Sequence, residues 1–419
     1  MTHRHLHSVS RPTAQDRMEG WNVYRELLDE LLEEENVSAT RAPFLLSPDW
    51  AFDILHEFVY QFQGFCQFRA AVHQSAAKHN IDPTAMPTNG VPHHLAENLT
   101  QLQQNPDAWA VETVTYYLNR LMKVGKTSNV PGYQYLGIFA SIALSRLECL
   151  LGDYEGCLAA AKSMMDLTVV GETSQEILHS CLSARLSHAY HAGVALFMTR
   201  RYQWCMKLLG DTCHVLGRGL KSGQFRKLAG SDQFGKLQDR MLALLAIVSH
   251  QCPARALDEN LTKTIREKHG STLAKIEEGS ASYESLFLFA SPKFISPASS
   301  IQAGDNYKLQ VRQFNKLMTN NLKLRSYMGL YTSISTSKLA AFADQSEEDF
   351  TSSLVSYKHQ MRQEEEDGEF KEALDIHYHL NGKMVNVDEA EKQRRFETYF
   401  MKQIRQNTEI RKDVGTIEV

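Results

Sequence analysis

The chain has 419 residues, enough for two or three domains and a sizeable core. It is 43% hydrophobic and 22% charged, as ordinary soluble globular proteins are. The formal net charge of −4 excludes a strong long-range attraction to nucleic acid or to an anionic membrane, although local basic patches are compatible with it.

Seven cysteines are spread along the chain without CxxC spacing, and most fall in apolar helical patterns. Their odd number and their spacing indicate buried free thiols in a reducing compartment. No apolar run approaches the roughly 18 residues of a membrane span, and the polar N-terminus has no hydrophobic signal core. We therefore expect a cytoplasmic protein with no membrane contact.

Residues 1–43 are expected to form an N-terminal tail and one helix. The first 18 residues are polar and predicted to be disordered, and apolar residues at helical spacing follow from Trp21 to Glu35. Residues 44–130 form an N-terminal helical region. It opens with a long aromatic helix that Asp49 is expected to cap.

Residues 131–307 read as helical repeats, with one helix following another across short polar or glycine-bearing turns. A weak internal repeat supports this reading, because residues 151–158 match residues 199–206 at an offset of 48 residues. In both copies a helix ends, a tyrosine opens the next helix, and a cysteine follows. This pattern is typical of stacked helical hairpins of the tetratricopeptide kind. A single helix is predicted over residues 174–198.

Residues 308–387 predict a winged-helix module. After a helix from about Lys308, two short helices precede alternating runs around Asn381-Gly382, which is a strong hairpin signal. Ser346 is expected to cap the second short helix. The apolar positions that should form the core of the module are Leu339, Phe342, Phe350, Leu354 and Tyr357.

Residues 388–419 are predicted to form a C-terminal helix and tail, with the helix starting at Asp388. A narrow apolar stripe runs along this helix, and we expect it to bind a partner. The alternative is that the helix folds back on its own winged helix. The stripe consists of Phe396, Tyr399, Phe400 and Ile404.

One stretch imitates a phosphate-binding loop. Gly230 to Lys236 matches GxxxxGK, but Leu237 stands where a Ser or Thr must hold magnesium, and no strand precedes the motif. A glycine-rich loop between helices is the preferred interpretation. We expect no nucleotide.

Histidines are the remaining candidates for chemistry, but none has the spacing of a complete ligand set. Packing side chains or incidental surface residues explain them better, and no nucleophile motif is present. The sequence therefore predicts no metal, no cofactor and no enzyme activity. The histidines considered are His3, His5, His7, His188, His191, His377 and His379.

A winged helix raises the question of nucleic acid. The helix that would enter the major groove opens with Glu347, Glu348 and Asp349, which would face phosphates. From Lys323 to the C-terminus, 14 Lys and Arg residues stand against 18 Asp and Glu residues. This balance favours protein contact, with at most a weak or indirect contact to RNA through Lys358, Arg362 or Lys383.

Helical hairpins, a winged helix and a terminal helix in this order resemble a PCI domain, the module shared by the proteasome lid, the signalosome and eukaryotic translation initiation factor 3. Several short stretches of the sequence are similar to the subunit L family of that factor, and together they cover about residues 44 to 412. The matching stretches are 53–63 (DILHEFVYQFQ), 150–154 (LLGDY), 200–203 (RRYQ), 242–247 (LALLAI), 266–270 (REKHG), 291–294 (SPKF), 338–342 (KLAAF), 357–359 (YKH) and 367–370 (DGEF).

The resemblance implies a non-catalytic scaffold in a hetero-oligomer, with the other subunits of initiation factor 3 and the small (40S) ribosomal subunit as partners. Two alternatives stay open: a PCI subunit of the proteasome lid or signalosome, and a PCI protein that binds RNA directly. The N-terminal region is shorter than the family pattern, and the loops at 78–105 and 217–235 differ from it, so contacts made through these parts are in doubt.

Overall fold

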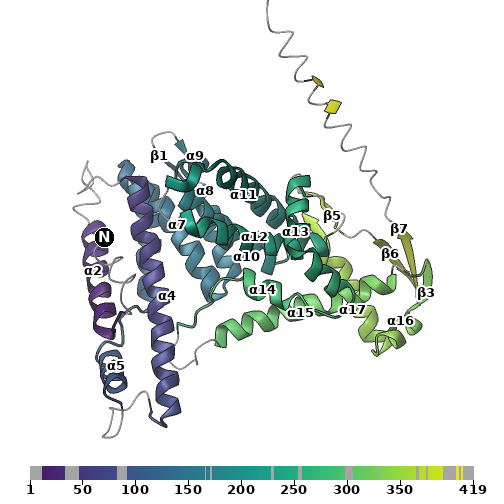
Figure 1. Ribbon diagram of the computed structural model, residues 1–419, viewed down its shortest axis with the longest axis horizontal. Helices are drawn as coiled ribbons and strands as arrows, with labels where there is room; N and C mark the ends of the chain where they lie inside the picture. The colour runs from purple at the N-terminus through teal and green to yellow at the C-terminus, as the bar shows by residue number, and fades with distance from the viewer. Residues whose placement is uncertain are drawn as a thin grey trace, which may run out of the picture. The chain divides into compact units, whose positions relative to one another are not determined.

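The computed structural model describes residues 12–33, 47–82, 92–165, 167–169, 172–227, 231–252, 257–297, 305–328, 330–364, 368–373, 376–389, 403–404 and 407–408. The chain divides into two compact units. We call Met1–His250 with Leu257–Met318 the solenoid unit, and Gln251–Ala256 with Thr319–Val419 the winged-helix unit. The fold is mainly α, with helical repeats followed by a winged helix, as the sequence predicts (Figure 1).

The solenoid unit consists of successive helices and one very short antiparallel strand pair, β1 with β2. In chain order its elements are α2 (Ala14–Leu32), α4 (Pro48–Lys78), α5 (His93–Gln104), α6 (Val111–Thr127), α7 (Pro131–Leu151), α8 (Tyr154–Met165), β1 (Thr168–Val169), β2 (Glu172–Thr173), α9 (Ser174–Ser180), α10 (Leu182–Met198), α11 (Tyr202–Ser222), η1 (Gln224–Lys227), α12 (Ser231–Gln251), α13 (Glu259–Glu277), α14 (Glu284–Ala290) and the first part of α15 (Asp305–Met328).

Two helix starts differ from the prediction. Helix α2 begins at Ala14, inside the stretch expected to be disordered, because Thr13 and Asp16 form a reciprocal capping box that satisfies its first amides. Helix α4 begins at Pro48 after the N-cap residue Ser47, so the prediction that Asp49 caps it is wrong. Proline suits the first helical position because it has no amide hydrogen to leave unpaired.

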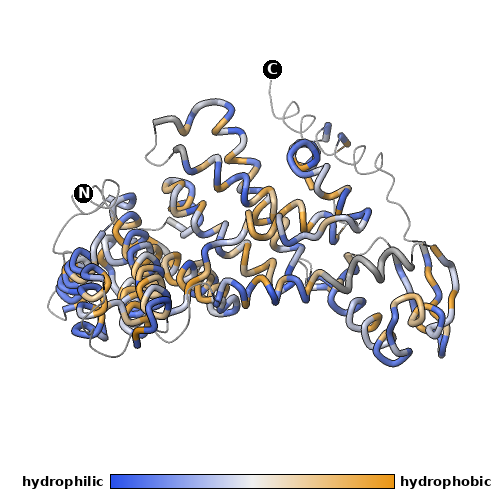
Figure 2. Tube along the Cα trace, turned by 60° about the horizontal axis from the view of Figure 1, so that its bottom comes forward, coloured by the Kyte–Doolittle hydropathy of each residue, from blue (hydrophilic) through white to orange (hydrophobic). Residues whose placement is uncertain are grey.

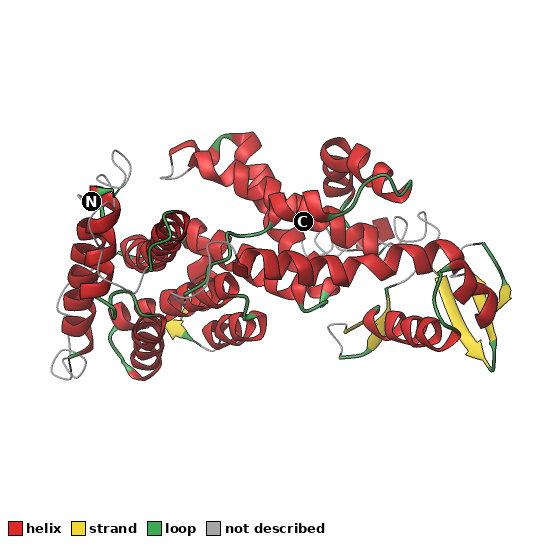
Figure 3. Cartoon of the chain, turned by 90° about the horizontal axis from the view of Figure 1, so that it is seen from below, coloured by secondary structure: helices red, strands yellow, loops and turns green. Residues whose placement is uncertain are grey.

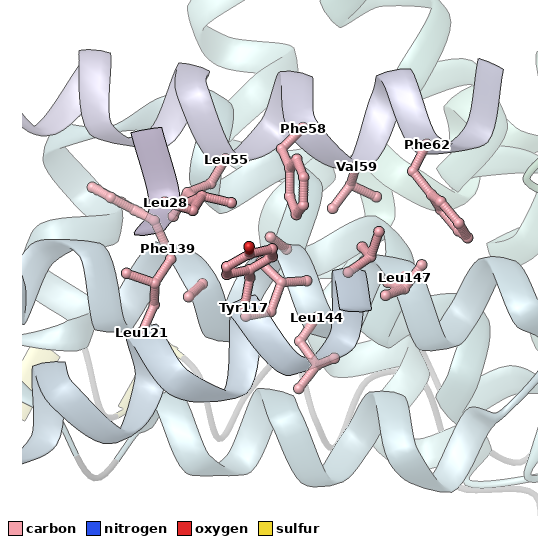
Figure 4. Packing of buried hydrophobic residues seen from close by; sticks show 14 of the residues in the cluster. Leu28, Leu55, Phe58, Val59, Phe62, Tyr117, Leu121, Phe139, Leu144 and Leu147 are labelled. Atoms are coloured by element: carbon pink, nitrogen blue, oxygen red, sulfur yellow. The ribbon is translucent and has the colours of Figure 1, made fainter. Parts of the chain in front are cut away.

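The core of the N-terminal helical region lies between α4, α6 and α7. Figure 4 shows Phe58, Val59 and Phe62 of α4 pointing toward Phe139 and Leu147 of α7. The side chains in the figure belong to a continuous buried cluster that reaches from Met18 to Ile295. Along the helices, hydrophobic and hydrophilic residues alternate as amphipathic packing requires (Figure 2).

Helices α6 and α7 cross with their backbones almost in contact. A Cβ atom added at Gly125 would lie 2.6 Å from the Cα of Gly137, and one added at Gly137 would lie 2.8 Å from the Cα of Gly125. Only glycine at both positions allows this approach.

Helix α7 corrects the expectation about membrane spans. By length and composition Pro131–Leu151 is apolar enough to cross a bilayer, but 78% of its most apolar window is buried inside the protein. It contacts α4, α6, α8 and α10, so its all-round hydrophobicity is that of a central core helix.

The internal repeat corresponds to two helical hairpins, α7–α8 and α10–α11. Tyr154 and Tyr202 are the first residues of the second helices, and α10 packs on both α7 and α8. The repeated cysteines donate similar bonds, from Cys157 Sγ to the carbonyl of His191 (3.7 Å) and from Cys205 Sγ to that of Gly193 (3.4 Å). The helix predicted over residues 174–198 is interrupted at Cys181, where α9 ends and α10 begins.

An extended segment, residues 291–297, returns along the solenoid unit toward α4 and α7. The amide of Ile295 donates to the carbonyl of Leu150 (2.9 Å), and Gln63 of α4 donates to the carbonyl of Lys293 (3.1 Å). Asn306, in the first turn of α15, donates to both Leu151 (3.0 Å) and Ile295 (2.7 Å). This segment therefore fixes the start of α15 against the end of α7.

The winged-helix unit contains a three-stranded antiparallel sheet of order β3-β7-β6 and a separate β4–β5 hairpin (Figure 3). Its elements after α15 are β3 (Ser333–Ser335), α16 (Thr336–Phe342), α17 (Glu347–Gln360), β4 (Arg362–Glu364), β5 (Phe370–Glu372), β6 (Ile376–Asn381) and β7 (Met384–Glu389). The sequence reading found α16, α17 and the β6–β7 hairpin but missed β3, β4 and β5.

The hairpin turn lies one residue later than its Asn-Gly signal suggests. Asn381 pairs with Met384, so the two loop residues are Gly382 and Lys383. Gly382 has φ +59°, and glycine with a positive φ at the first central position is typical of a type II′ turn. Strand β7 continues to Glu389, so the prediction that a helix starts at Asp388 is wrong.

Candidate partner-binding surface of the winged-helix unit

The start of α16 is tied to the hairpin turn and to the start of α17. The amide of Thr336 donates to the carbonyl of Lys383 (2.9 Å), and its hydroxyl donates to Glu347 Oε1 (2.6 Å). Ser335 accepts a bond from the amide of Lys338 and caps α16. These bonds hold the two helices over the sheet.

The core of the unit is small. Leu339, Phe350, Leu354 and Tyr357 are buried at the positions where the helical spacing predicts them. Met361, the fourth position of the buried stripe that the helical spacing of residues 350–361 predicts, is buried as well, and further buried apolar residues come from α16 and the strand segments. These further residues are Ile334, Ala340, Ala373, Tyr378 and Val385.

Tyr378 links the sheet to α17, which we call the recognition-type helix because it corresponds to the helix that enters the major groove in winged helices that bind DNA. Its hydroxyl donates to the carbonyl of Leu354 (2.6 Å), and burial raises the pKa of this phenol. The ammonium of Lys358 donates to the carbonyl of Tyr378 (2.7 Å). One of the three cations considered for a phosphate contact therefore makes a structural bond within the unit.

Phe342 does not belong to this core. Its side chain is 51% exposed at the C-terminal end of α16, so the prediction that it packs inside is corrected. The next residue, Ala343, already ends the helix. Residue spacing alone could not distinguish the last position of a seven-residue helix from an inward-facing one.

Phe342 is one of several large apolar side chains that the winged-helix unit exposes. Phe370 of β5 is 58% exposed, the largest fraction on a strand. Within the ranges that the structure describes, the solenoid unit exposes eight such side chains but is almost three times as long, so their density is higher on the winged-helix unit. The exposed set consists of Leu330, Tyr331, Phe342, Val355, Phe370, Met384 and Ile404.

The N-terminal turn of α17 is acidic, as predicted. Ser346 accepts a bond from the amide of Asp349 (3.1 Å), which confirms it as the N-cap. Glu347 and Glu348 follow in the first turn, and Glu347 lies 3.9 Å from the ammonium of Lys383. Carboxylates suit the positive end of a helix dipole but repel a phosphate backbone.

The apolar stripe of the predicted C-terminal helix falls largely outside the described residues. This applies to Phe396, Tyr399 and Phe400. Ile404 lies in a described pair of helical residues and is 57% exposed.

The stretch that matches the pattern of a phosphate-binding loop is helical from Ser231 onward. Helix α12 starts at Ser231 and includes Gly235, Lys236 and Leu237, so the preferred reading as a loop between helices is wrong. The amides of Gly235, Lys236 and Leu237 lie past the first turn and bond within the helix, so they cannot wrap around a phosphate.

His188 and His191 are buried in α10. Burial lowers the pKa of His188 to about 4 and that of His191 to about 3, with the positive charge of Arg146 adding to the shift at His191. His191 Nδ1 bonds the carbonyl of Ser187 (2.7 Å). Both rings are therefore neutral packing residues at physiological pH.

The other two described histidines considered as metal ligands are partly exposed and contact carboxylates. His379 lies 3.4 Å from Asp388, and His377 contacts Glu372, on the outer face of the β6–β7 hairpin. Within the described parts of the chain, no three His, Cys, Asp or Glu side chains come together as a metal site would require. All seven cysteines are free and buried, as predicted. The histidines at positions 3, 5 and 7 lie outside the described residues.

Helical repeats that lead into a winged helix with strand order β3-β7-β6 define a PCI-type protein. Residues 16–407 match the family model described as RNA polymerase I-associated factor PAF67. The chain is 29% identical to translation initiation factor 3 subunit L of Nematostella vectensis, over 96% of this chain and 78% of the relative. It is 28% identical to the Mus musculus protein of that name, over 97% and 74%, and 27% identical to the human one, over 97% and 74%.

The family model covers most of the chain, so the chain belongs to the PAF67 family, whose curated relatives carry the name of translation initiation factor 3 subunit L. The resemblance inferred from the sequence motifs is confirmed.

Proposed function

We propose that the chain is a non-catalytic scaffold subunit of translation initiation factor 3 that acts in assembly of the initiation complex on the small (40S) ribosomal subunit. The family membership supports the complex, and one structural observation carries the scaffold role. The described part of the winged-helix unit exposes seven large apolar side chains, and its recognition-type helix opens with carboxylates. Such a surface fits other protein subunits better than a duplex.

The absence of catalysis is part of this proposal. Thiols serve as nucleophiles only as thiolates, and burial raises the pKa of Cys66 to about 11 and those of Cys181 and Cys213 to about 12. The buried histidines of α10 bond or pack within the core. These groups support a structural role in the cytoplasm, where thiols stay reduced.

The C-terminal stripe of Phe396, Tyr399, Phe400 and Ile404 extends the proposal. Burying one such side chain stabilises a protein by roughly 1.5–3 kcal/mol. We therefore expect a helix of a partner subunit to pack against the stripe. The proposed division of the chain keeps the predicted boundaries at 43/44 and 130/131, whereas those predicted at 307/308 and 387/388 fall inside α15 and β7. Deletion of residues 390–419 should abolish assembly with the other subunits and leave the melting temperature unchanged. A monomer destabilised by the deletion would mean that the helix covers its own unit.

Affinity purification of the tagged chain from cells, with mass spectrometry of its partners, tests the proposal. We expect the other subunits of initiation factor 3 and proteins of the 40S subunit in near-stoichiometric amounts. Recovery of proteasome-lid or signalosome subunits instead would replace this function with the alternative assembly of the same fold class. Recovery of the chain alone would contradict both.

A further inference from the structure

Positive charge is concentrated in one segment of the chain, which belongs to the solenoid unit except for Gln251–Ala256. From Arg200 to Glu277 the chain carries 14 Lys and Arg residues and 7 Asp and Glu residues, a net of +7 in a protein whose total is −4. The rest of the chain therefore has a net charge of −11. The segment comprises α11, α12 and α13, which pack together: Gly217 of α11 faces Gln238 of α12, and Gly210 faces Leu257 and Leu261 at the start of α13.

Helix α11 arranges its share of this charge on one side. Spacings of three and four residues place six side chains along a single stripe about 25 Å long. Its members are Trp204, Lys207, Asp211, His214, Arg218 and Lys221. Lys207, Arg218 and Lys221 are exposed, and Trp204 is half-buried with the ammonium of Lys207 5.7 Å from its ring. We call this set the α11 stripe.

Several exposed cations in this segment have no carboxylate partner among the described residues. Arg201 pairs with Glu155 (2.9 Å), and Lys268 pairs with Asp239. Arg218, Lys221 and the exposed cations of α12 and α13 apart from Lys268 have no ion pair within the described parts of the chain. The latter are Lys236, Lys263, Arg266 and Lys275. Asp211 is the one carboxylate within the stripe.

The same segment lacks the apolar anchors of a protein interface. Among the described residues, no large apolar side chain between Met165 and Leu288 is prominently exposed, in contrast to the seven on the winged-helix unit. Protein interfaces depend on buried aromatic or aliphatic anchors. Single-stranded nucleic acid is held instead by cations along the backbone and by an aromatic ring that stacks on a base.

We propose that the α11 stripe is a binding surface for single-stranded RNA, with Lys207, Arg218 and Lys221 on phosphates and Trp204 stacked on a base. This surface lies in the solenoid unit, not in the winged helix where the fold suggests nucleic acid. It goes beyond the scaffold role and does not depend on it.

Fluorescence anisotropy of the full chain with a labelled, unstructured RNA of about 20 nucleotides tests the proposal across a range of salt. Each phosphate contact on a single strand contributes about 0.7 to the slope of log affinity against log salt. Arg218→Glu with Lys221→Glu should therefore lower the slope by about 1.4 and weaken binding at least ~10-fold. Trp204→Leu should weaken binding at least ~5-fold with an unchanged slope, since it removes stacking and no charge.

Lys123→Glu with Lys126→Glu on α6 is the matched control. These two exposed lysines have the same spacing near a helix C-terminus, and their reversal changes net charge equally. We expect this control to bind RNA like the unaltered chain, and all variants to keep its melting temperature. Equal weakening by both charge reversals, or no RNA binding by the unaltered chain, would overturn the proposal. Polyglutamate that binds as tightly as RNA would overturn it in favour of an acidic protein.

Discussion

The two units of the molecule differ in the size of the core that their apolar residues form. The solenoid unit encloses a continuous cluster from α2 to α10, with α7 buried on nearly all sides. The winged-helix unit has a small core around Leu354 and Phe350 and leaves Phe342 and Phe370 more than half exposed. The first unit has the core of an independently stable domain, whereas the second keeps apolar surface for contacts outside itself.

Charge divides the chain along a different line. The carboxylates of the winged-helix unit cluster where the fold would read a major groove, at the start of α17. The cations cluster on α11 to α13 of the solenoid unit. The fold class alone points to the winged-helix unit for an RNA contact, whereas the distribution of charged side chains favours the solenoid unit.

The largest expected effect is on the small core. Leu354→Ala removes a fully buried side chain and should lower the free energy of unfolding of the winged-helix unit by about 2–5 kcal/mol. Hydrogen exchange resolved by peptide should show faster exchange in α16, α17 and the sheet, with α4 and α7 unchanged. Phe342→Ala is the control and should cost less than about 1 kcal/mol, because the ring is half exposed. Equal effects of the two variants would show that this core is misassigned.

The next effect tests the packing of the solenoid unit. Gly137→Ala places a methyl group against the backbone of Gly125, so α6 and α7 must separate, at a cost of about 1–3 kcal/mol. Gly270→Ala on α13 is the matched change. Its Cβ would meet only the side chain of Arg266 at 3.4 Å, and removing a helical glycine should be neutral or stabilising. Chemical denaturation measures both, and a Gly137→Ala variant as stable as the unaltered chain would refute the close crossing.

A smaller effect concerns pH. Because the pKa values of His188 and His191 are lowered to about 4 and about 3, the unfolded chain takes up protons near pH 6.5 that the folded chain does not. The stability present at pH 7 should therefore decrease as the pH falls below about 6.5, by about 2 kcal/mol per histidine at pH 5. His188→Leu should remove about half of this dependence in denaturation experiments at the two pH values. A variant with the full pH dependence would show that His188 is protonated in the fold.

Much of the fold follows from local patterns. The spacing of Leu339, Phe350, Leu354 and Tyr357 locates a small core because helical periodicity states which residues face inward. The offset of 48 residues between Tyr154 and Tyr202 reveals the repeated hairpins because each copy has the same packing. Burial of all seven cysteines follows from their apolar surroundings.

Other features depend on contacts between distant segments. Three residues of β3 form a strand only because β7 is beside them, and the break at Cys181 has no proline or glycine signal. Phe342 follows the helical spacing but lies where α16 ends. The α11 stripe has ordinary helical spacing, and its significance emerges only when ion pairs and exposed apolar residues are known across the unit.

The most direct test of the scaffold account replaces exposed apolar residues in each unit and quantifies co-purified partners. Phe342→Ser with Phe370→Ser alters the winged-helix unit, and Val23→Ser with Tyr116→Ser is the control on similarly exposed residues of the solenoid unit. The account predicts that the first pair loses most of the co-purified subunits while the control retains them, with both variants folded. Full recovery of partners by the Phe342→Ser and Phe370→Ser variant would contradict the claim that the winged-helix unit is the partner-binding surface.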